Sequence, residues 1–257
     1  MSKNKFHNIH IASSETPVAR KATKSLIKRY GSVPPEDADV IVALGGDGFM
    51  LQTLHGSTHL DAPVYGMNCG TIGFLMNEFN EKDLLERLNL AEEEKINPLA
   101  MVAECSDGTR HESLAINEVS VLRAGPQAAK LQISIDGKVR MEELVCDGAL
   151  LSTPAGSTAY NYSAHGPILP IGSEVLALTA IAPFRPRRWR GALVPKAAKV
   201  RIDVLEADKR PVMADADSRS VKDVIWVEIS SSTDVVHCIL FDPGHGLEER
   251  LTMEQFT

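Results

Sequence analysis

Gly45, Gly46 and Gly48 surround a single carboxylate, that of Asp47, directly after the apolar residues 40–44. Glycines permit positive φ and let backbone N–H groups approach an anion closely. The N-terminus of a following helix adds partial positive charge, which suits phosphate. A carboxylate repels phosphate, so Asp47 makes sense as a group that orients a hydroxyl, or accepts its proton, during phosphate transfer to it. The alternative is a plain turn in which Asp47 caps the helix.

Asn117 and Glu118 interrupt the otherwise apolar stretch "LAINEVSVLR" at 114–123. Because side chains alternate along a strand, one of the two must point to the side that the apolar neighbours occupy. A buried carboxylate needs polar partners, and the hydroxyl groups of a ligand would supply them. The alternative is an edge strand or a β-bulge.

A dense group of small hydroxyl residues, "TPAGSTAY" at 153–160, follows the apolar stretch "ALLS". Hydroxyl side chains and a glycine at a helix start favour anions and sugar hydroxyls, and Tyr160 adds a ring for stacking. The alternative is an ordinary Ser/Thr helix cap. Farther on, "RPRRWR" at 185–190 concentrates four arginines. These could face a phosphate, or form a solvated loop or a subunit contact.

Several classes of protein are disfavoured. Neither GxxxxGK[ST] nor GxGxxG occurs, so a P-loop ATPase or a standard dinucleotide-binding dehydrogenase is not supported. His55 and His59 lack a third ligand, so we expect no metal site built by the protein. A net charge of −7 argues against nucleic-acid binding. With no membrane-span-like run, no apolar leader and four widely spaced cysteines, we expect a reduced cytoplasmic protein without a membrane partner.

Strands and helices must alternate to position the first motif. We expect strands at 6–13, 40–44 and 63–68, and helices at 15–30, from the glycine turn through 58, and at 81–94. Ser14 would cap the first helix, Gly31 would end it, and Val18, Ala22, Leu26 and Tyr30 would share one face. Asn80 would open the third helix, after a second glycine-bearing turn at 68–75. This alternation predicts an α/β unit with a parallel sheet.

The pattern changes near residue 97. Short alternating stretches follow one another, separated by turn signals such as Asp107-Gly108 and Asp136-Gly137, as hairpins require. Further strands are expected at 199–206, 211–215, 224–230 and 235–241, and a final helix at 246–256. The second part of the chain is therefore predicted to be rich in β-structure.

Taken in order and spacing, these motifs resemble the NAD kinases over about residues 40–195. "GGDG" alone is shared with diacylglycerol, sphingosine and 6-phosphofructokinase-type kinases, whereas "TPxGSTAY" is characteristic of the NAD kinases. The resemblance implies α/β plus all-β architecture: a Rossmann-like N-terminal domain with a parallel sheet at 1–97, and a β-sandwich-like, NAD-binding C-terminal domain at 98–240. It also implies an active site between them and a tail at 241–257 that packs back on the first domain.

The implied reaction transfers the terminal phosphate of ATP, or of polyphosphate, to the adenosine-ribose 2′-hydroxyl of NAD, with Mg²⁺ or another divalent cation accompanying ATP. Asp47 would be catalytic, and Gly45, Gly46 and Gly48 would bind phosphate. The implied contacts of NAD are Asp47, Gly48, Asn117, Glu118, Asp147, Ala155, Thr158, Ala159, Tyr160, Ser163, Asp215 and Asp217. Ala155 replaces a threonine of the family motif. A homodimer or homotetramer is implied. The alternatives are a lipid or sugar kinase that shares "GGDG", and a non-catalytic dinucleotide sensor.

Overall fold

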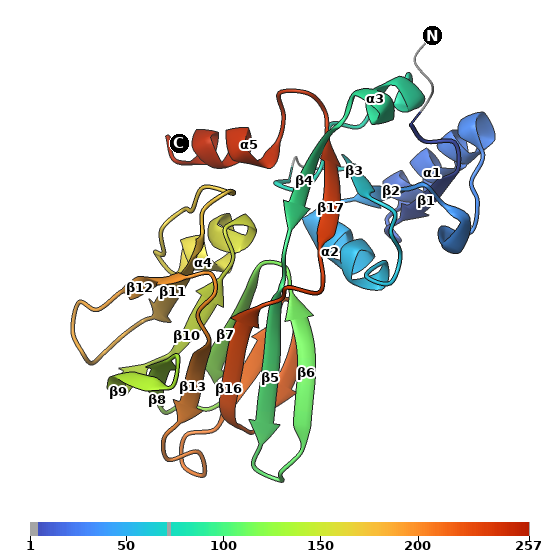
Figure 1. Ribbon diagram of the computed structural model, residues 1–257. Coiled ribbons are helices and arrows are strands. Elements are labelled where there is room, and N and C mark those ends of the chain that lie inside the picture. Colours follow the sequence, from blue (N-terminus) through green and yellow to red (C-terminus); the bar gives the residue numbers. More distant parts are fainter. Residues whose placement is uncertain (1–4, 71–72, 257) are drawn as a thin grey trace. The chain divides into compact units, whose positions relative to one another are not determined.

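The computed structural model describes residues 5–70 and 73–256, which form two compact units (Figure 1). The first unit comprises the residues up to Ile96 together with Val235–Phe256, and the second comprises Asn97–Asp234. The sequence had suggested that 235–240 belong with the second part of the chain. They lie in the first unit because the strand that they form pairs with strands of that unit.

A five-stranded sheet of order β1-β2-β3-β17-β4 organises the first unit. Its parallel members are β1 (Ile9–Ser13), β2 (Val40–Gly45), β3 (Val64–Asn68) and β17 (His237–Phe241). β4 (Glu92–Ile96) runs antiparallel to β17. Every residue of β2 and β3 is buried, as expected of strands covered on both faces. The predicted α/β unit with a parallel sheet is confirmed.

The helices of this unit follow the strands. They are α1 (Pro17–Tyr30), η1 (Pro35–Asp37), α2 (Asp47–Gly56), α3 (Leu84–Leu90) and α5 (Leu247–Glu254). α1 packs on β1 and β2, and α2 packs on β2 and β3. Alternate residues of β2, namely Val40, Val42 and Leu44, share one hydrophobic cluster with Leu26 of α1. Because β2 leads straight into α2, Asp47 is held at the carboxyl edge of the sheet, where ligands of such folds usually bind.

Two predicted helix starts are wrong. Thr16, not Ser14, caps α1: its Oγ1 accepts from the Ala19 N–H at 3.3 Å, and Pro17 occupies the first helical position, where it suits a helix. The predicted helix at 81–94, opened by Asn80, is shortened to α3. Its polar end forms β4 instead, because the backbone of β17 offers a pairing partner that overrides local helix propensity.

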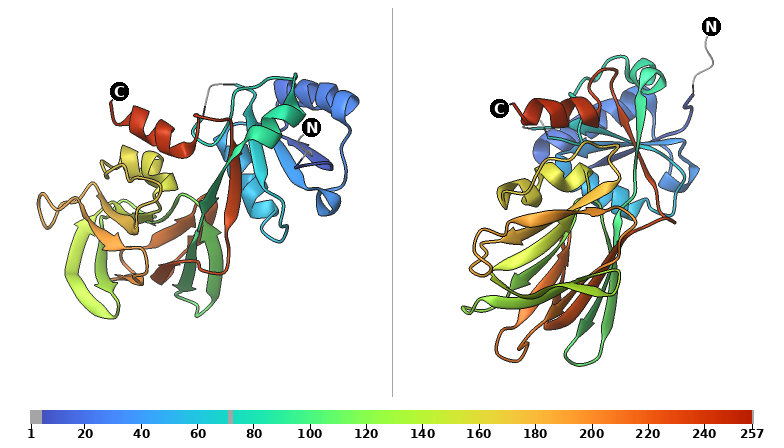
Figure 2. Two further views of the ribbon diagram at one scale, coloured as in Figure 1. Left: turned by 45° about the horizontal axis from the view of Figure 1, so that its top comes forward. Right: turned by 60° about the vertical axis from the view of Figure 1, so that its left-hand side comes forward.

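The second unit consists of two six-stranded antiparallel sheets (Figure 2). The first, of order β12-β11-β10-β7-β14-β15, contains β7 (Glu118–Arg123), β10 (Gly148–Ser152), β11 (Val175–Ile181), β12 (Gly191–Pro195), β14 (Val212–Ala216) and β15 (Arg219–Lys222). The second, of order β6-β5-β16-β13-β8-β9, contains β5 (Leu99–Cys105), β6 (Arg110–Ala115), β8 (Ala129–Ile135), β9 (Lys138–Cys146), β13 (Val200–Val204) and β16 (Val224–Ser231). Buried residues of both sheets form one core, which confirms the predicted sandwich.

The register of the first of these sheets settles the environment of the Asn117-Glu118 pair. β7 lies between β10 and β14, and both pairings run without a register shift. Glu118 therefore begins a central strand, and neither an edge strand nor a bulge explains it. After β10, the chain turns through η2 (Ala155–Thr158) and α4 (Tyr160–Ser163), which together carry the hydroxyl-rich motif. None of the helices in residues 5–70 and 73–256 is long and apolar enough to traverse a bilayer.

Candidate active site

Asp47 is the first residue of α2, and its side chain turns toward the second glycine-bearing loop. Its Oδ2 accepts a hydrogen bond from the Phe74 N–H at 2.7 Å, and its Oδ1 accepts one from the Leu75 N–H at 2.9 Å. Gly46 is the N-cap residue of α2, and no side chain caps the helix. The carboxylate is thus fixed by two main-chain donors instead of serving as a helix cap, and lone pairs on both oxygens remain for a ligand.

The glycines around Asp47 matter because they lack a side chain. Glycine permits positive φ, but the backbone does not adopt it at Gly45, Gly46 or Gly48. A Cβ atom on Gly45 would lie 2.8 Å from the Cβ of Phe49, so a side chain would collide with α2. A Cβ atom on Gly46 or Gly48 would meet nothing within 4 Å. These two positions leave bare main chain beside Asp47.

The second glycine turn, predicted at 68–75, forms the other wall of this group. Thr71 and Ile72 lie outside the described residues. Asn68 Oδ1 accepts from the Gly70 N–H at 2.9 Å, which closes the start of the turn. A Cβ atom on Gly73 would lie only 2.3 Å from Asp47 Oδ1. Any side chain at position 73 would therefore collide with the Asp47 carboxylate, so this position requires glycine.

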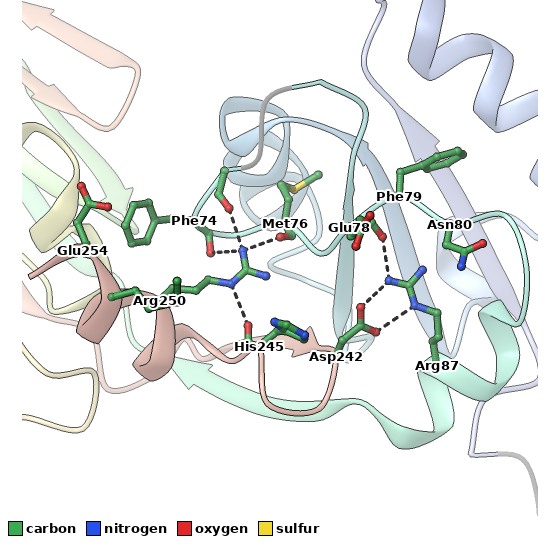
Figure 3. A pocket seen from close by; sticks show the side chains of 12 residues that line it. Phe74, Met76, Glu78, Phe79, Asn80, Arg87, Asp242, His245, Arg250 and Glu254 are labelled. Atoms are coloured by element: carbon green, nitrogen blue, oxygen red, sulfur yellow. Dashed lines mark hydrogen bonds and ion pairs between the residues drawn. The ribbon is translucent and has the colours of Figure 1, made fainter. Parts of the chain in front are cut away.

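A pocket of about 650 Å³ in the same unit shares this loop (Figure 3). Two arginines line it, and the protein itself engages both. Arg87 donates to Asp242 through Nε at 3.1 Å and Nη2 at 2.5 Å, and Nη2 also donates to the Glu78 carbonyl oxygen at 2.8 Å. The guanidinium of Arg250 binds carbonyl oxygens of the loop. Both arginines therefore brace the first unit.

In the second unit, Asp217 joins the end of β14 to the Asn117-Glu118 motif. Its Oδ2 accepts from the Ile116 N–H at 2.8 Å, and its Oδ1 accepts from the Asn117 and Glu118 N–H groups at 2.9 and 3.4 Å. Asp217 has a φ of 51°, a left-handed conformation that aspartate tolerates better than most residues. The structure thus brings Asn117, Glu118 and Asp217 together.

Glu118 is the most perturbed acid of this group. Burial, and then repulsion from Asp217, raise the pKa of Glu118 to about 7, although a hydrogen bond from the Tyr160 N–H acts in the opposite direction. Its Oε2 atom is shielded from solvent and has no hydrogen-bond partner among the described residues. A buried polar atom without a partner is costly in a folded protein, and a ligand can satisfy it.

The hydroxyl-rich motif packs directly against the residues that lead into β7. Thr153 Oγ1 donates to the Ile116 carbonyl oxygen at 2.7 Å and accepts from the Gly156 N–H at 3.0 Å. A Cβ atom on Gly156 would lie 2.2 Å from the Asn117 carbonyl oxygen. Only glycine allows this close approach of two backbones. The bond from the Gly156 N–H to Thr153 resembles an ordinary Ser/Thr helix cap, but the contacts with Ile116 and Asn117 go beyond one.

A buried polar network supports the turn from the other side. Asn161 Nδ2 donates to the carbonyl oxygens of Ser157 and Pro167 at 3.0 and 2.9 Å, and its Oδ1 accepts from Thr179 Oγ1 at 2.6 Å. Ser157, Asn161 and Thr179 are all buried. These bonds fix the conformation that presents the Tyr160 segment.

The remaining predicted residues lie around this group. Asp147 pairs with Arg123, whose Nε lies 2.6 Å from its Oδ1, and Ser220 donates to Asp215. Burial raises the pKa of Tyr160, and nearby Glu118, Asp147 and Asp215 raise it further. Ala155 is buried, Thr158 and Ala159 are half-buried, and Ser163 is exposed.

Two further expectations concern the arginine-rich stretch and a metal site. The four arginines of 185–190 are exposed, and Trp189 packs against the core of the second unit. Within residues 5–70 and 73–256, no group of three or more His, Cys, Asp or Glu side chains is arranged to hold a metal ion.

Sequence reasoning missed the donors that hold Asp47. The second glycine turn was recognised as a motif, but Gly73, Phe74 and Leu75 received no role. A stretch such as "TIGFL" after a strand could have suggested main-chain donors, because glycine next to an apolar pair leaves its N–H groups free to bind an anion. Arg250 gave no such signal, because its contacts join segments far apart in the sequence.

The chain matches two family models in tandem. Residues 1–96 match the ATP-NAD kinase N-terminal domain, and residues 116–240 match the ATP-NAD kinase C-terminal domain. A protein of Cereibacter sphaeroides named NAD kinase is 69% identical over 248 residues, which cover 96% of this chain and 98% of that protein. An NAD kinase of Caulobacter vibrioides is 61% identical, over 95% of this chain and 94% of that protein.

Solved structures share the fold. Yeast NADH kinase complexed with NADH superimposes with a TM-score of 0.84 at 22% sequence identity, covering 99% of this chain and 88% of that one. An NAD kinase from Archaeoglobus fulgidus in complex with ATP gives a TM-score of 0.77 at 23% identity, covering 96% of this chain and 98% of that one. At this identity the likeness supports the architecture alone.

Proposed function

The chain belongs to the NAD kinase family and is a phosphotransferase that makes NADP from NAD, and from this premise we propose the roles of its residues. The observation that carries the proposal is the environment of the Asp47 carboxylate at the carboxyl edge of a parallel sheet. The Phe74 and Leu75 N–H groups align it, and the glycines on either side, Gly46 and Gly48, place no side chain beside it. The lipid- or sugar-kinase alternative, which "GGDG" alone left open, has no support from the relatives.

Asp47 is proposed to accept a hydrogen bond from the adenosine-ribose 2′-hydroxyl. It aligns the oxygen of that hydroxyl for attack on the terminal phosphorus of ATP. The bond between this oxygen and phosphorus forms while the bond from phosphorus to ADP breaks, and the hydroxyl proton passes to Asp47 or to a phosphate oxygen. Such transfers depend mainly on alignment and electrostatics, so a fixed carboxylate is the appropriate group. The main chain at Gly45, Gly46 and Gly48 is proposed to approach the phosphates.

NAD is proposed to bind the second group of residues. Glu118 is the central contact, because its shielded Oε2 lacks a partner and can donate a hydrogen bond when it is protonated. Tyr160 offers its ring and hydroxyl. The other proposed contacts are Asn117, Asp147, Ala155, Thr158, Ala159, Ser163, Asp215 and Asp217.

Mg²⁺ is proposed to arrive as part of the ATP substrate. This ion keeps several waters and is usually held by phosphate oxygens together with one or two carboxylates, so it needs no dedicated protein cage. We also propose a cytoplasmic location and a homodimer or homotetramer in solution.

The test is an NADP-formation assay with the purified chain. NAD with Mg-ATP is expected to give NADP, and chelation of divalent ions is expected to stop the reaction. Parallel reactions with NADH as acceptor and polyphosphate as donor define the substrate range. Binding of NAD by calorimetry without any NADP formed would support the non-catalytic sensor instead.

A further inference from the structure

Arg250 of α5 reaches across the first unit to the loop that holds Asp47 (Figure 3). Its Nη1 lies 2.8, 3.2 and 2.6 Å from the carbonyl oxygens of Gly73, Phe74 and Met76. Its Nε donates to the His245 carbonyl oxygen at 2.9 Å, which fixes the guanidinium itself. One side chain thus gathers the carbonyl groups of a short segment about 175 residues away in the chain.

The N–H groups and the carbonyl groups of this segment have different partners. The N–H groups of Phe74 and Leu75 point to the carboxylate of Asp47, while carbonyl oxygens of Gly73, Phe74 and Met76 point to Arg250. A cation at the carbonyl side polarises these peptide groups and strengthens the hydrogen bonds that their N–H groups donate. The guanidinium therefore both positions the N–H groups that bind the Asp47 carboxylate and strengthens their hydrogen bonds.

The position of Arg250 is itself well fixed. Leu247 and Leu251 of the same helix are buried, and the guanidinium carbon lies 5.3 Å from the centre of the Phe241 ring. Burial lowers the pKa of Arg250, while the nearby carboxylates of Asp47 and Asp242 act in the opposite direction. A charge that is partly removed from water interacts more strongly with its neighbours than one on the surface.

We propose that Arg250 is a positioning residue for phosphoryl transfer: it holds the 73–76 segment in the conformation that presents the Phe74 and Leu75 N–H groups to Asp47. The inference rests on the proposed role of Asp47. Because misplacement of reacting groups by about 1 Å can slow a reaction about 100-fold, a segment released from Arg250 would slow the chemical step. Binding of NAD, whose proposed contacts lie mostly in the second unit, would change little.

Arg250→Met removes every donor of the guanidinium, and Arg250→Lys keeps a charged donor. We expect Arg250→Met to lower kcat about tenfold or more with a KM for NAD within about threefold of wild type, and Arg250→Lys to recover part of the loss. Amide exchange at Phe74 and Leu75 should accelerate in Arg250→Met. A structural role alone would not separate kcat from KM in this way.

Arg87→Met is the matched control. It removes a partly buried arginine of the same unit that binds Asp242 and the Glu78 carbonyl oxygen, not the carbonyl groups of 73–76. It should lower the melting temperature at least as much as Arg250→Met, with kcat within about threefold of wild type. If Arg250→Met does not fold, Arg250→Gln, which keeps donors without charge, takes its place with the same expectations.

Wild-type kcat in Arg250→Met, unchanged exchange at Phe74 and Leu75, or an equal loss of kcat in Arg87→Met would each overturn the inference. Asp47→Asn, measured in parallel, separates the proposed role of Arg250 from the proposed role of Asp47. If Asp47→Asn is inactive and Arg250→Met is fully active, only the positioning role of Arg250 is refuted. If Asp47→Asn is fully active, the proposed role of Asp47 is refuted, whatever Arg250→Met does.

Discussion

Gly73 and Asp47 fit each other so closely that a Cβ atom on Gly73 would lie 2.3 Å from Oδ1 of Asp47. Non-bonded heavy atoms make favourable contact at about 3.5–4.0 Å, so the carboxylate or the loop would have to move. The acid and its glycine stand in two different motifs of the sequence, and the structure makes them parts of one arrangement.

Gly73→Ala is therefore expected to lower turnover by displacing Asp47, by about tenfold or more. Gly70→Ala is the matched control in the same loop, because a Cβ atom there would meet only Asn68 Oδ1 at 4.0 Å. Steady-state kinetics of both variants, with melting temperatures, check the prediction. Equal kcat in the two alanine variants would show that the close approach of Gly73 and Asp47 has no bearing on turnover.

Glu118 predicts a dependence of folding stability on pH. Its pKa is about 7 in the folded chain against an ordinary value of 4.5, so the folded state holds this proton more tightly than the unfolded state. The free energy of unfolding should therefore fall as the pH rises from about 4.5 to about 7, and the contribution of this group to the loss is about 3 kcal/mol. Below about pH 4.5 the carboxyl is protonated in both the folded and the unfolded state, so Glu118 no longer makes the free energy of unfolding depend on pH.

Glu118→Gln removes this titration. Relative to wild type, the ligand-free variant should gain roughly 2–3 kcal/mol of unfolding free energy between about pH 5 and about pH 8, as measured by denaturant titration. A constant difference between the two proteins across this range would contradict the raised pKa.

Gly156→Ala tests the packing of the hydroxyl-rich turn on β7. The added Cβ would lie 2.2 Å from the Asn117 carbonyl oxygen, and backbone on both sides leaves little room to adjust. We expect a loss of about 1–3 kcal/mol in unfolding free energy, together with weaker NAD binding. Gly172→Ala, where a Cβ atom would meet nothing within 4 Å, is the control and should match wild type in both measurements.

Local signals predicted much of the fold. The continuous apolar run at 40–44 became β2, buried on both faces, and the glycine turn after it opened α2 as expected. The turn Asp136-Gly137 joins β8 to β9 with positive φ at both residues, as a two-residue hairpin requires. Gly31, with a φ of 77°, ends α1. In each case a short stretch contains the signal, because glycine readily adopts positive φ and a continuous apolar run suits a buried strand.

Pairing between strands that are far apart in the sequence could not be predicted from these local signals. The stretch at 92–96 is rich in glutamate and reads as a helix end, but it forms β4 because β17, which is remote in sequence, lies beside it. Val18, expected on the buried face of α1, is 61% exposed, whereas its neighbour Ala19 is buried together with Ala22 and Leu26. A single stretch of sequence contains no information on a partner that arrives later in the chain.

The candidate site divides in the same way. The identities of Asp47, Glu118 and the hydroxyl-rich turn followed from motif chemistry and from the family resemblance. The hydrogen bonds that fix these groups did not: the carboxylate of Asp217 accepts from the N–H groups of Ile116 and Asn117, about 100 residues away in the chain. Only the three-dimensional arrangement shows which backbone groups orient which acid.

The central claim is that Asp47 aligns the ribose hydroxyl for phosphoryl transfer, and the turnover of Asp47→Asn tests it most directly. The amide keeps the size of the side chain but loses the negative charge and one acceptor oxygen, so it cannot take up the proton of the hydroxyl. NAD affinity by calorimetry and the melting temperature serve as controls for binding and folding. We predict a fall in kcat of about 100-fold or more, with the Kd for NAD nearly unchanged. A folded Asp47→Asn variant that forms NADP at the wild-type rate would contradict the claim.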